Sequence, residues 1–191
     1  VGTNRNDILA RFLEANDMSV AAVEPSLSPS MDIQVSSNVE RLLFELLGRD
    51  AAATAEAMHR FRATGRMPVP DAAWREATAL FRGFRLDDGG TLEEIARTHR
   101  RTGYLADPHT AIGLAAARAL AGTADGAPMV VAATAHPAKF PDAVARATGV
   151  RPALPPHLAD LDRREERYTV VPNDLPAVED FVRALALRNA A

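Results

Sequence analysis

Apolar residues recur along most of this chain with the three-to-four-residue spacing of amphipathic helices. Between residues 39 and 47, for example, one valine and four leucines fall on a single helix face. Residues that favour helix ends, such as asparagine or serine before a stripe and glycine after it, mark the boundaries. The pattern predicts helices over residues 5–13, 39–47, 51–63, 71–81, 92–102, 108–120 and 175–185, and one that begins at Pro137 or Pro141 and ends before Gly149.

Four short segments have the pattern of strands. Residues 128–134 form a continuous apolar run, which is typical of a buried strand in a parallel sheet. Residues 81–86 alternate apolar and polar side chains before a turn, and residues 19–23 and 168–171 are weaker candidates. The order of elements indicates an α/β or helix-rich α+β domain. Because the strands are too few for a complete sheet, we expect a piece of a larger one.

The helix before Gly103 has a recognisable start. Thr91 is followed three residues later by Glu94, which is the spacing of a capping box. In that motif the threonine hydroxyl and the glutamate side chain each bind a free backbone N–H of the first turn. We therefore expect Thr91 to cap this helix.

Composition excludes several functional classes. The 191 residues are 47% hydrophobic and 25% charged, as in globular proteins that bury a core. With 22 basic residues against 25 acidic ones and no basic stripe, binding to nucleic acid is not expected. The absence of cysteine excludes disulfides and thiolate metal sites and permits a cytoplasmic location. No apolar run approaches the ~20 residues of a membrane helix, so no membrane partner is expected.

Lysine is nearly absent from the chain. Lys139 is the single lysine, and the other 21 basic residues are arginines. Chemistry that needs an amine nucleophile thus has one candidate here, or uses a lysine from another segment. Neither of the glycine-rich phosphate-binding motifs of nucleotide enzymes occurs. Since the chain starts at Val1 without a methionine or a signal-peptide pattern, we expect that a preceding segment is missing.

One candidate site is the tetrapeptide Asp107-Pro108-His109-Thr110. It brings together a carboxylate, an imidazole and a hydroxyl at the start of a predicted helix. The simplest interpretation is a helix cap in which Asp107 accepts backbone N–H groups. A metal would need two further ligands, which no histidine spacing in the chain supplies, so no metal site is expected.

A second candidate site follows the apolar run that ends at Thr134. In α/β folds, ligands bind at the carboxyl ends of strands, which makes Thr134, His136 and Lys139 candidates. A strand-to-helix turn in which Thr134 satisfies a backbone group is an equally good interpretation. A catalytic lysine would need burial or a cationic neighbour to lower its pKa.

Four sequence blocks, in this order, resemble successive signatures of the threonine synthase family. They are TNRND at residues 3–7, SPSMDI with SSNVER at 28–33 and 36–41, GYLADPHTA at 103–111 and ATAHPAKFP at 133–141. The resemblance covers nearly all of this chain but only the C-terminal part of the family's enzymes. It implies an α/β fold, the C-terminal part of a pyridoxal-phosphate enzyme of fold type II (tryptophan synthase β-like), helix-rich with a few parallel strands.

The resemblance also implies an activity for the full-length protein. Threonine synthases use pyridoxal 5'-phosphate to convert O-phospho-L-homoserine and water into L-threonine and phosphate, as carbon–oxygen lyases of cytoplasmic threonine biosynthesis. The family's Schiff-base lysine and phosphate loop lie upstream of residue 3, so no catalytic residue is expected in this chain and Lys139 is not the Schiff-base lysine. The expected partner is the N-terminal portion of the same protein, and the chain alone is expected to be inactive.

The resemblance implies one residue that contacts the cofactor and a larger set of residues that border the active site. Thr134 matches the position at which the family places a neutral hydroxyl beside the pyridine nitrogen. For several border residues a local Asx or Ser turn is the alternative. The border candidates are Asn4, Asp7, Ser30, Asp32, Asn38, Asp107, His109, His136 and Lys139.

The expected domain organisation has two parts. Residues 1–150 would form the C-terminal part of the cofactor-binding catalytic region, with a helical insertion near 50–85, and residues 151–191 a connector and an amphipathic helix. Two other interpretations stay open: a self-sufficient non-catalytic binding domain derived from the enzyme, and another pyridoxal-phosphate lyase of the same fold type. Exposed apolar surface would favour part of an enzyme, because the missing half should pack there.

Overall fold

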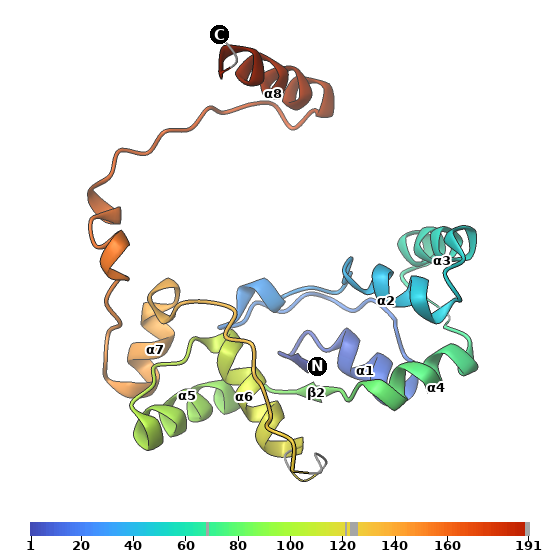
Figure 1. Ribbon diagram of the computed structural model, residues 1–191, viewed down its shortest axis with the longest axis horizontal. Coiled ribbons are helices and arrows are strands. Elements are labelled where there is room, and N and C mark those ends of the chain that lie inside the picture. The colour runs from blue at the N-terminus through green and yellow to red at the C-terminus, as the bar shows by residue number, and fades with distance from the viewer. Residues whose placement is uncertain (68, 121, 123–125, 190–191) are drawn as a thin grey trace. The chain divides into compact units, whose positions relative to one another are not determined.

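The computed structural model describes residues 1–67, 69–120, 122 and 126–189. The chain divides into two compact units, Val1–Ala153 and Leu154–Ala191, which are taken separately below. The first unit contains, in order, β1 (Gly2–Thr3), α1 (Ile8–Ala15), η1 (Pro29–Met31), α2 (Val39–Leu46), α3 (Ala51–Thr64), α4 (Asp71–Leu80), β2 (Phe84–Arg85), α5 (Asp88–Thr102), α6 (Pro108–Leu120), η3 (Pro137–Lys139) and α7 (Pro141–Thr148) (Figure 1).

The predicted helices are confirmed, with shifts of a few residues at their ends. At the start of α3, the Asp50 side chain accepts the backbone N–H of Ala53 at 3.0 Å. At its end, Gly65 takes the left-handed conformation with φ of 67°, which a residue without Cβ adopts at little cost. These local signals are strong enough in the sequence to be recognised without tertiary contacts.

The predicted capping box at Thr91 is wrong. Helix α5 begins one turn earlier, because the extended backbone of Asp87 lets its side chain accept the N–H of Gly90 at 2.8 Å. Thr91 lies inside the helix, is 1% exposed and donates its hydroxyl to the Asp87 carbonyl at 2.8 Å. Gly89 and Gly90, which lie where a turn after residue 86 was expected, are instead in the first turn of the helix.

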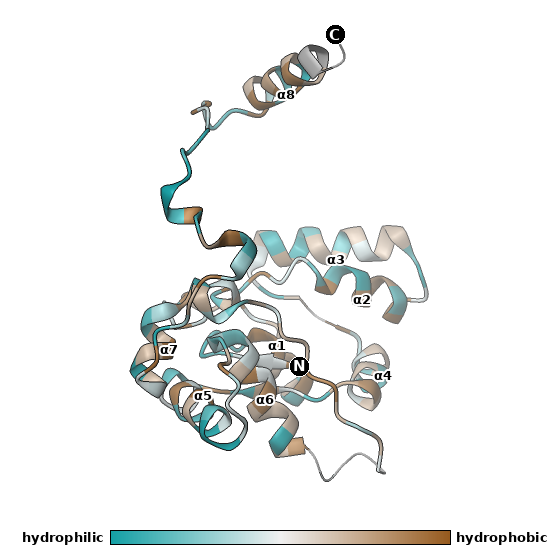
Figure 2. Ribbon diagram, turned by 60° about the vertical axis from the view of Figure 1, so that its left-hand side comes forward, coloured by the Kyte–Doolittle hydropathy of each residue, from teal (hydrophilic) through white to brown (hydrophobic). Residues whose placement is uncertain are grey.

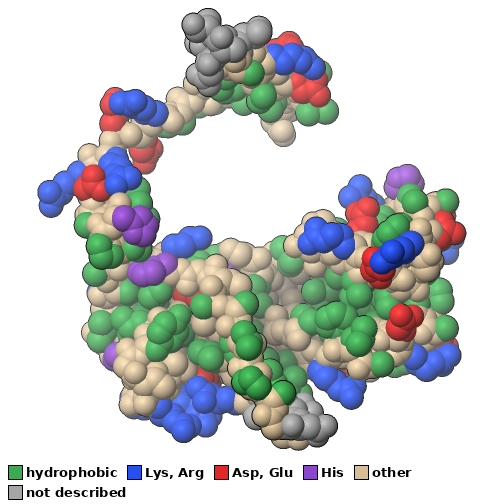
Figure 3. All heavy atoms as spheres, in the orientation of Figure 1, with side chains coloured by type: hydrophobic (Ala, Val, Ile, Leu, Met, Phe, Trp, Pro, Cys, Tyr) green, Lys and Arg blue, Asp and Glu red, His purple; other side chains and the backbone are tan. Residues whose placement is uncertain are grey.

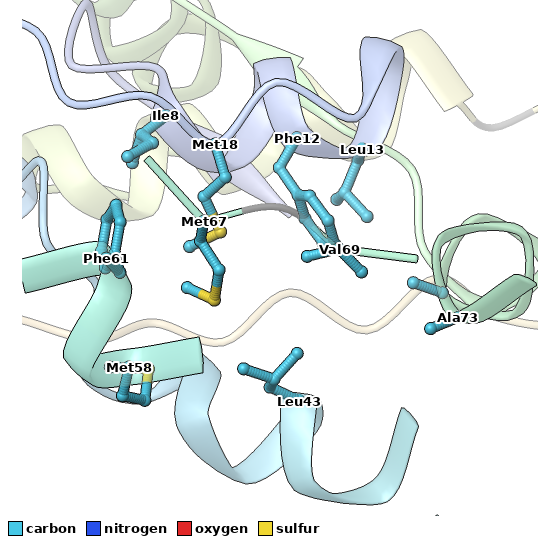
Figure 4. Close-up of a cluster of buried hydrophobic side chains, with 11 residues drawn as sticks. Ile8, Phe12, Leu13, Met18, Leu43, Met58, Phe61, Met67, Val69 and Ala73 are labelled. Atoms are coloured by element: carbon cyan, nitrogen blue, oxygen red, sulfur yellow. The ribbon is translucent and has the colours of Figure 1, made fainter. Parts of the chain in front are cut away.

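A first hydrophobic core joins α1 to the helices α2, α3 and α4 (Figure 4). Phe12 projects from α1, Phe61 from α3 and Leu43 from α2, and each is at most 3% exposed. Fully burying a side chain of this size stabilises the fold by about 1.5–3 kcal/mol. The buried members are Ile8, Phe12, Leu13, Met18, Leu43, Met58, Phe61, Met67, Val69, Ala73 and Ala77.

A second packed region holds α6, the helix that carries the candidate tetrapeptide. Helix α5 packs against both α6 and α7. Ile95, Ile112 and Val144, one from each helix, are fully buried. The position of α6 is therefore set by its apolar contacts with α5, which leaves its N-terminal residues in a defined place.

The strands form a single parallel pair in the described residues. Gly2 pairs with Phe84 and Thr3 with Arg85. A Cβ on Gly2 would lie 2.9 Å from Cγ2 of Ile112, so β1 runs unusually close to α6. The expected class, helix-rich with few parallel strands, is confirmed.

Three of the four predicted strands are wrong. Residues 19–23 contribute only an isolated bridge from Ser19 to Arg66, and residues 128–134 and 168–171 are extended without a ladder in the described chain. Val130, predicted to be buried, is 86% exposed. Apolar content favours a strand, but a ladder also needs a neighbour whose N–H and C=O groups are free to pair.

The second unit consists of η4 (Pro156–Leu158), η5 (Leu161–Arg163) and α8 (Leu175–Asn189). Apolar and polar residues alternate around α8, as the colouring of Figure 2 shows. Its residues Val178, Val182 and Leu185 are 37%, 56% and 42% exposed. Arg183 forms ion pairs with Glu179 and Asp180 on the same helix.

Candidate functional site

A cavity of about 560 Å³ opens between β1, η1, α6 and the extended residues 129–134. Alkyl side chains form most of its walls, and the polar side chains among them are those of Ser30, His109 and Thr134. A concave, mainly apolar space with a few polar groups is the usual form of a small-molecule site. The structure thus brings together three of the residues that the sequence singled out.

Thr134 reaches the cavity from a segment that has no sheet around it. The residues before it, Met129 and Val130, are 48% and 86% exposed. Hydrophobic side chains, green in Figure 3, gather at the surface along the connection between α6 and α7. Thr134 is itself exposed and lines the cavity.

Asp107 is fully buried at the start of α6. Its Oδ1 accepts the backbone N–H of His109 at 2.9 Å and lies 2.9 Å from Nδ1 of the same residue, and its Oδ2 accepts the Thr110 hydroxyl. Burial by itself raises the pKa of Asp107, but the hydrogen bonds from His109 and Thr110 outweigh burial and hold the pKa below its usual range. The carboxylate is therefore ionised at neutral pH, and Asp107 caps α6 as predicted.

One ring nitrogen of His109, Nδ1, is hydrogen-bonded, whereas the other, Nε2, is not hydrogen-bonded within the described part of the chain. An ionised carboxylate only accepts hydrogen bonds, so Nδ1 carries a proton and donates it to Asp107. Nε2 is buried and has no hydrogen-bond partner in the described part of the chain. The side chain is 7% exposed, and its ring packs against that of Phe140 with 4.7 Å between centroids. A fixed imidazole with a free nitrogen therefore stands in the cavity wall.

Comparisons with known proteins point to one family. Residues 110–182 match the family model described as threonine synthase, C-terminal. The threonine synthase of Pseudomonas aeruginosa is 54% identical over 183 residues, 95% of this chain and 39% of that protein. The chain resembles the C-terminal portion of threonine synthases.

The structural comparison agrees. A crystal structure of PLP-bound threonine synthase from Brucella melitensis aligns with a TM-score of 0.83 and 47% identity over 96% of this chain and 39% of that one. The yeast threonine synthase structure aligns with a TM-score of 0.80 and 29% identity over 95% of this chain and 40% of that one. The chain thus spans about two fifths of the length of the threonine synthases it matches.

His136 and Lys139 lie next to the segment of this threonine synthase-like chain that lines the cavity. His136 caps η3, because its Nδ1 accepts the N–H of Ala138 at 3.2 Å. The ammonium of Lys139 lies 5.9 Å from the centroid of the Phe140 ring. Both side chains are exposed, and neither belongs to the cavity wall that the described residues form.

Asn4 and Asp32 belong to one hydrogen-bond network. Asn4, 1% exposed, donates from Nδ2 to Oδ1 of Asp32 at 2.7 Å. Ser26 donates its hydroxyl to the same oxygen at 2.6 Å, and Asn6 donates to it from Nδ2 at 3.0 Å. The network fastens the loop that contains η1 to the residues after β1, which holds Ser30 at the cavity.

The remaining predicted residues have separate surroundings. Asp7 accepts hydrogen bonds from Arg11 at 3.0 Å and Arg85 at 2.9 Å. Burial raises the pKa of Asp7, but the two arginines outweigh it and lower the pKa. Asn38 precedes α2 with an exposed side chain that makes no cap hydrogen bond. Ser30 is therefore the one residue of this group that lines the cavity.

Sequence reasoning missed the residues of α6 beyond His109 that form the cavity floor. His109, Gly113, Ala117 and Leu120 line the cavity at the spacing of successive turns. A Cβ on Gly113 would lie 2.9 Å from Cγ1 of Val131, so glycine permits the close approach of the extended segment. The three-to-four-residue spacing from His109 was the available signal.

Within the described residues, no three side chains of histidine, aspartate or glutamate are grouped so as to hold a metal ion. None of the helices they form has the length and apolar character that would let it cross a membrane.

Proposed function

We propose that this chain is the C-terminal part of a pyridoxal-phosphate-dependent threonine synthase. Together with an N-terminal portion that carries the Schiff-base lysine and the phosphate loop, it converts O-phospho-L-homoserine and water into L-threonine and phosphate in the cytoplasm. The observation that carries the proposal is the 54% identity to the Pseudomonas aeruginosa enzyme over 95% of the chain. Because only 39% of that enzyme is covered, we expect the isolated chain to be inactive.

The residues of the cavity fit this cofactor by their chemistry. Alkyl walls suit a flat aromatic ring, and the Thr134 hydroxyl is a neutral hydrogen-bond partner for a pyridine nitrogen. When bound, the cofactor supplies the electron sink, while the protein supplies orientation and tuning. Unlike a carboxylate, a hydroxyl does not force a proton onto the nitrogen, so we assign Thr134 the role of a neutral partner.

The other residues of the wall have supporting roles in this proposal. The alkyl groups of α6 and residues 129–132 give the site an apolar lining against which the cofactor ring can pack. The Asn4–Asp32 hydrogen bond holds Ser30 at the opposite wall. These roles need no charge in the cavity other than that of the bound molecules.

Exposed apolar side chains support the interpretation as part of a larger enzyme. Among the described residues of the first unit, four valines and one isoleucine besides Val130 are more than 40% exposed. Soluble monomers seldom expose extended apolar patches, so a covering surface is expected. We propose that the N-terminal portion provides it, which a self-sufficient binding domain would not need. These side chains are Val1, Val20, Val23, Ile33 and Val35.

A chimera tests the proposal. This chain would replace the matching C-terminal portion of the Pseudomonas aeruginosa enzyme, and L-threonine and phosphate would be measured from O-phospho-L-homoserine. We expect the chimera to turn over and the isolated chain not to. In the chimera, Thr134→Val should weaken cofactor binding by about tenfold, which corresponds to the loss of one hydrogen bond. Thr134→Ser should keep most of the affinity.

Thr148→Val is the matched control. The Thr148 hydroxyl donates to the Val144 carbonyl at 2.8 Å within α7 and lies outside the cavity wall, so cofactor binding should not change. A folded chimera that binds the cofactor but forms no threonine would overturn the proposed activity. Equal cofactor affinity in Thr134→Val and Thr148→Val would overturn the role of Thr134.

A further inference from the structure

Helix α6 carries a glycine in its interior that its backbone does not require. Gly113 lies in the middle of α6, and its φ is not in the left-handed region that favours glycine. Alanine is the more stable residue inside a helix, because glycine loses more conformational freedom on folding. The glycine therefore needs another reason, such as the close approach of a neighbouring segment.

Val131 provides that reason. A Cβ on Gly113 would lie 2.9 Å from Cγ1 of Val131. Apart from neighbouring atoms of α6 itself, no other described atom would lie within 4 Å of this Cβ, so the conflict is with one methyl group. Because carbon atoms in contact are about 3.5–4.0 Å apart, Gly113→Ala would displace Val131 by about 1 Å.

The helix cannot move in place of Val131. It packs against α5, and Ile112 lies so close to β1 that a Cβ on Gly2 would be 2.9 Å from its Cγ2. Residues 129–134, by contrast, form no ladder in the described chain. The χ1 of valine is stiff because two Cγ atoms branch from its Cβ, so rotation of the side chain relieves little. The displacement therefore falls on the backbone of this extended segment.

The same extended segment carries Thr134 into the cavity wall. We propose that Gly113 is a positioning residue, which sets the place of the Thr134 hydroxyl by letting Val131 rest against α6. The inference rests on the proposed function, in which that hydroxyl is the neutral partner of the pyridine nitrogen. Since hydrogen bonds need donor–acceptor distances of about 2.7–3.2 Å, a shift of about 1 Å is enough to break this one.

The cofactor affinity of the chimera tests the inference. Titration of the cofactor-free chimera with pyridoxal 5'-phosphate should show about tenfold weaker binding in Gly113→Ala, which corresponds to the loss of one hydrogen bond. The urea midpoint of the cofactor-free chimera should stay unchanged or rise, because Gly113→Ala favours the helix. A lower midpoint together with weaker binding would indicate a folding defect and overturn the positioning role.

Val131→Ala provides the rescue. It removes Cγ1, the atom that the new methyl group would meet, so Gly113→Ala should cost no affinity in a chimera that already carries Val131→Ala. Gly89→Ala is the matched control, because a Cβ there would have no atom nearer than 3.5 Å and Gly89 lies outside the cavity wall. This control should bind the cofactor as tightly as the parent chimera. An equal cost of Gly113→Ala with and without Val131→Ala overturns the inference.

A second pair of variants shows whether the effect passes through Thr134. Gly113→Ala and Thr134→Val should together weaken binding no more than either alone, because both remove the same hydrogen bond. Losses that multiply overturn the inference. Parent-like affinity in Gly113→Ala, with weaker binding in Thr134→Val, also overturns it and leaves the proposed function intact. Parent-like affinity in Thr134→Val instead overturns the proposed role of Thr134, and this inference with it.

Discussion

Removal of the Asp107 carboxylate is the perturbation whose cost follows most directly from the structure. The carboxylate is fully buried and accepts hydrogen bonds from the backbone N–H and the ring of His109 and from the Thr110 hydroxyl. Asp107→Ala leaves two to three buried donors without partners, each costing about 1–3 kcal/mol, so we expect a loss of about 4 kcal/mol in the free energy of unfolding.

Asp107→Asn should cost less. The amide keeps the shape and one acceptor oxygen but lacks the charge, and hydrogen bonds to a charged group are roughly twice as strong as neutral ones. We therefore expect a loss of about 2 kcal/mol. In urea unfolding of the chain, followed by circular dichroism, the midpoint should fall by about 1 M for Asn and 2 M for Ala, for a slope of about 2 kcal/mol per molar.

Asp142→Asn provides the control for this series. Asp142 forms an ion pair with Arg151 at 2.8 Å, but the two side chains are 89% and 68% exposed. Exposed ion pairs contribute little to the free energy of unfolding, so the urea midpoint of this variant should be close to that of the parent chain. The reasoning fails if Asp107→Ala and Asp107→Asn lie as close to the parent as Asp142→Asn does.

Acid should act on the same carboxylate. The pKa of Asp107 is lowered in the folded chain below its ordinary value of 3.8, so its contribution to stability is complete above pH 3.8 and is lost as pH falls through the folded pKa. The parent chain should therefore lose stability below about pH 4 more steeply than Asp107→Asn. Parallel pH dependences of the two midpoints would contradict the assignment.

Two glycine variants and one tryptophan variant test packing and hydrogen bonding in the first unit. Gly83→Ala should destabilise the chain by about 1–3 kcal/mol, because the new Cβ would lie 2.9 Å from the backbone of Ala10. Gly89→Ala is the contrasting variant, because Gly89 is exposed on α5 and a Cβ there would have no atom nearer than 3.5 Å. This variant should stabilise the chain by about 0.5–1 kcal/mol. Equal effects of the two glycine variants on the urea midpoint would refute both predictions. Trp74→Phe removes the hydrogen bond from Nε1 to the Phe12 carbonyl at 2.7 Å. The free energy of unfolding should fall by about 1 kcal/mol in the same urea assay. An unchanged urea midpoint would contradict this prediction.

Local patterns in the sequence were sufficient for the helices. The stripe of α2, the left-handed Gly65 after α3 and the proline at the start of α6 act within one or two turns, so neighbouring residues decide them. Asp107 as a cap belongs to the same class, because its partners are its own next residues. The error at Thr91 arose where two local signals competed, and Asp87 made the better cap.

The candidate site could be predicted only in pieces. Thr134 and His109 were identified from separate motifs, and nothing in their spacing indicated that they share a cavity wall with Ser30. Their convergence depends on the packing of α6 against α5 and β1 and on the close approach at Gly113. Long-range packing of this kind has no signature in a single sequence.

The sequence by itself determined the positions of the helices, the cap of α6 and the resemblance to one enzyme family. Tertiary structure alone decided which strands exist, because a strand forms only where another segment offers free N–H and C=O groups. Gly2 finds such a partner in Phe84, while the more apolar residues 128–134 find none in the described chain. The same dependence on distant partners applies to His109, whose free nitrogen is seen only once the atoms around it are in place.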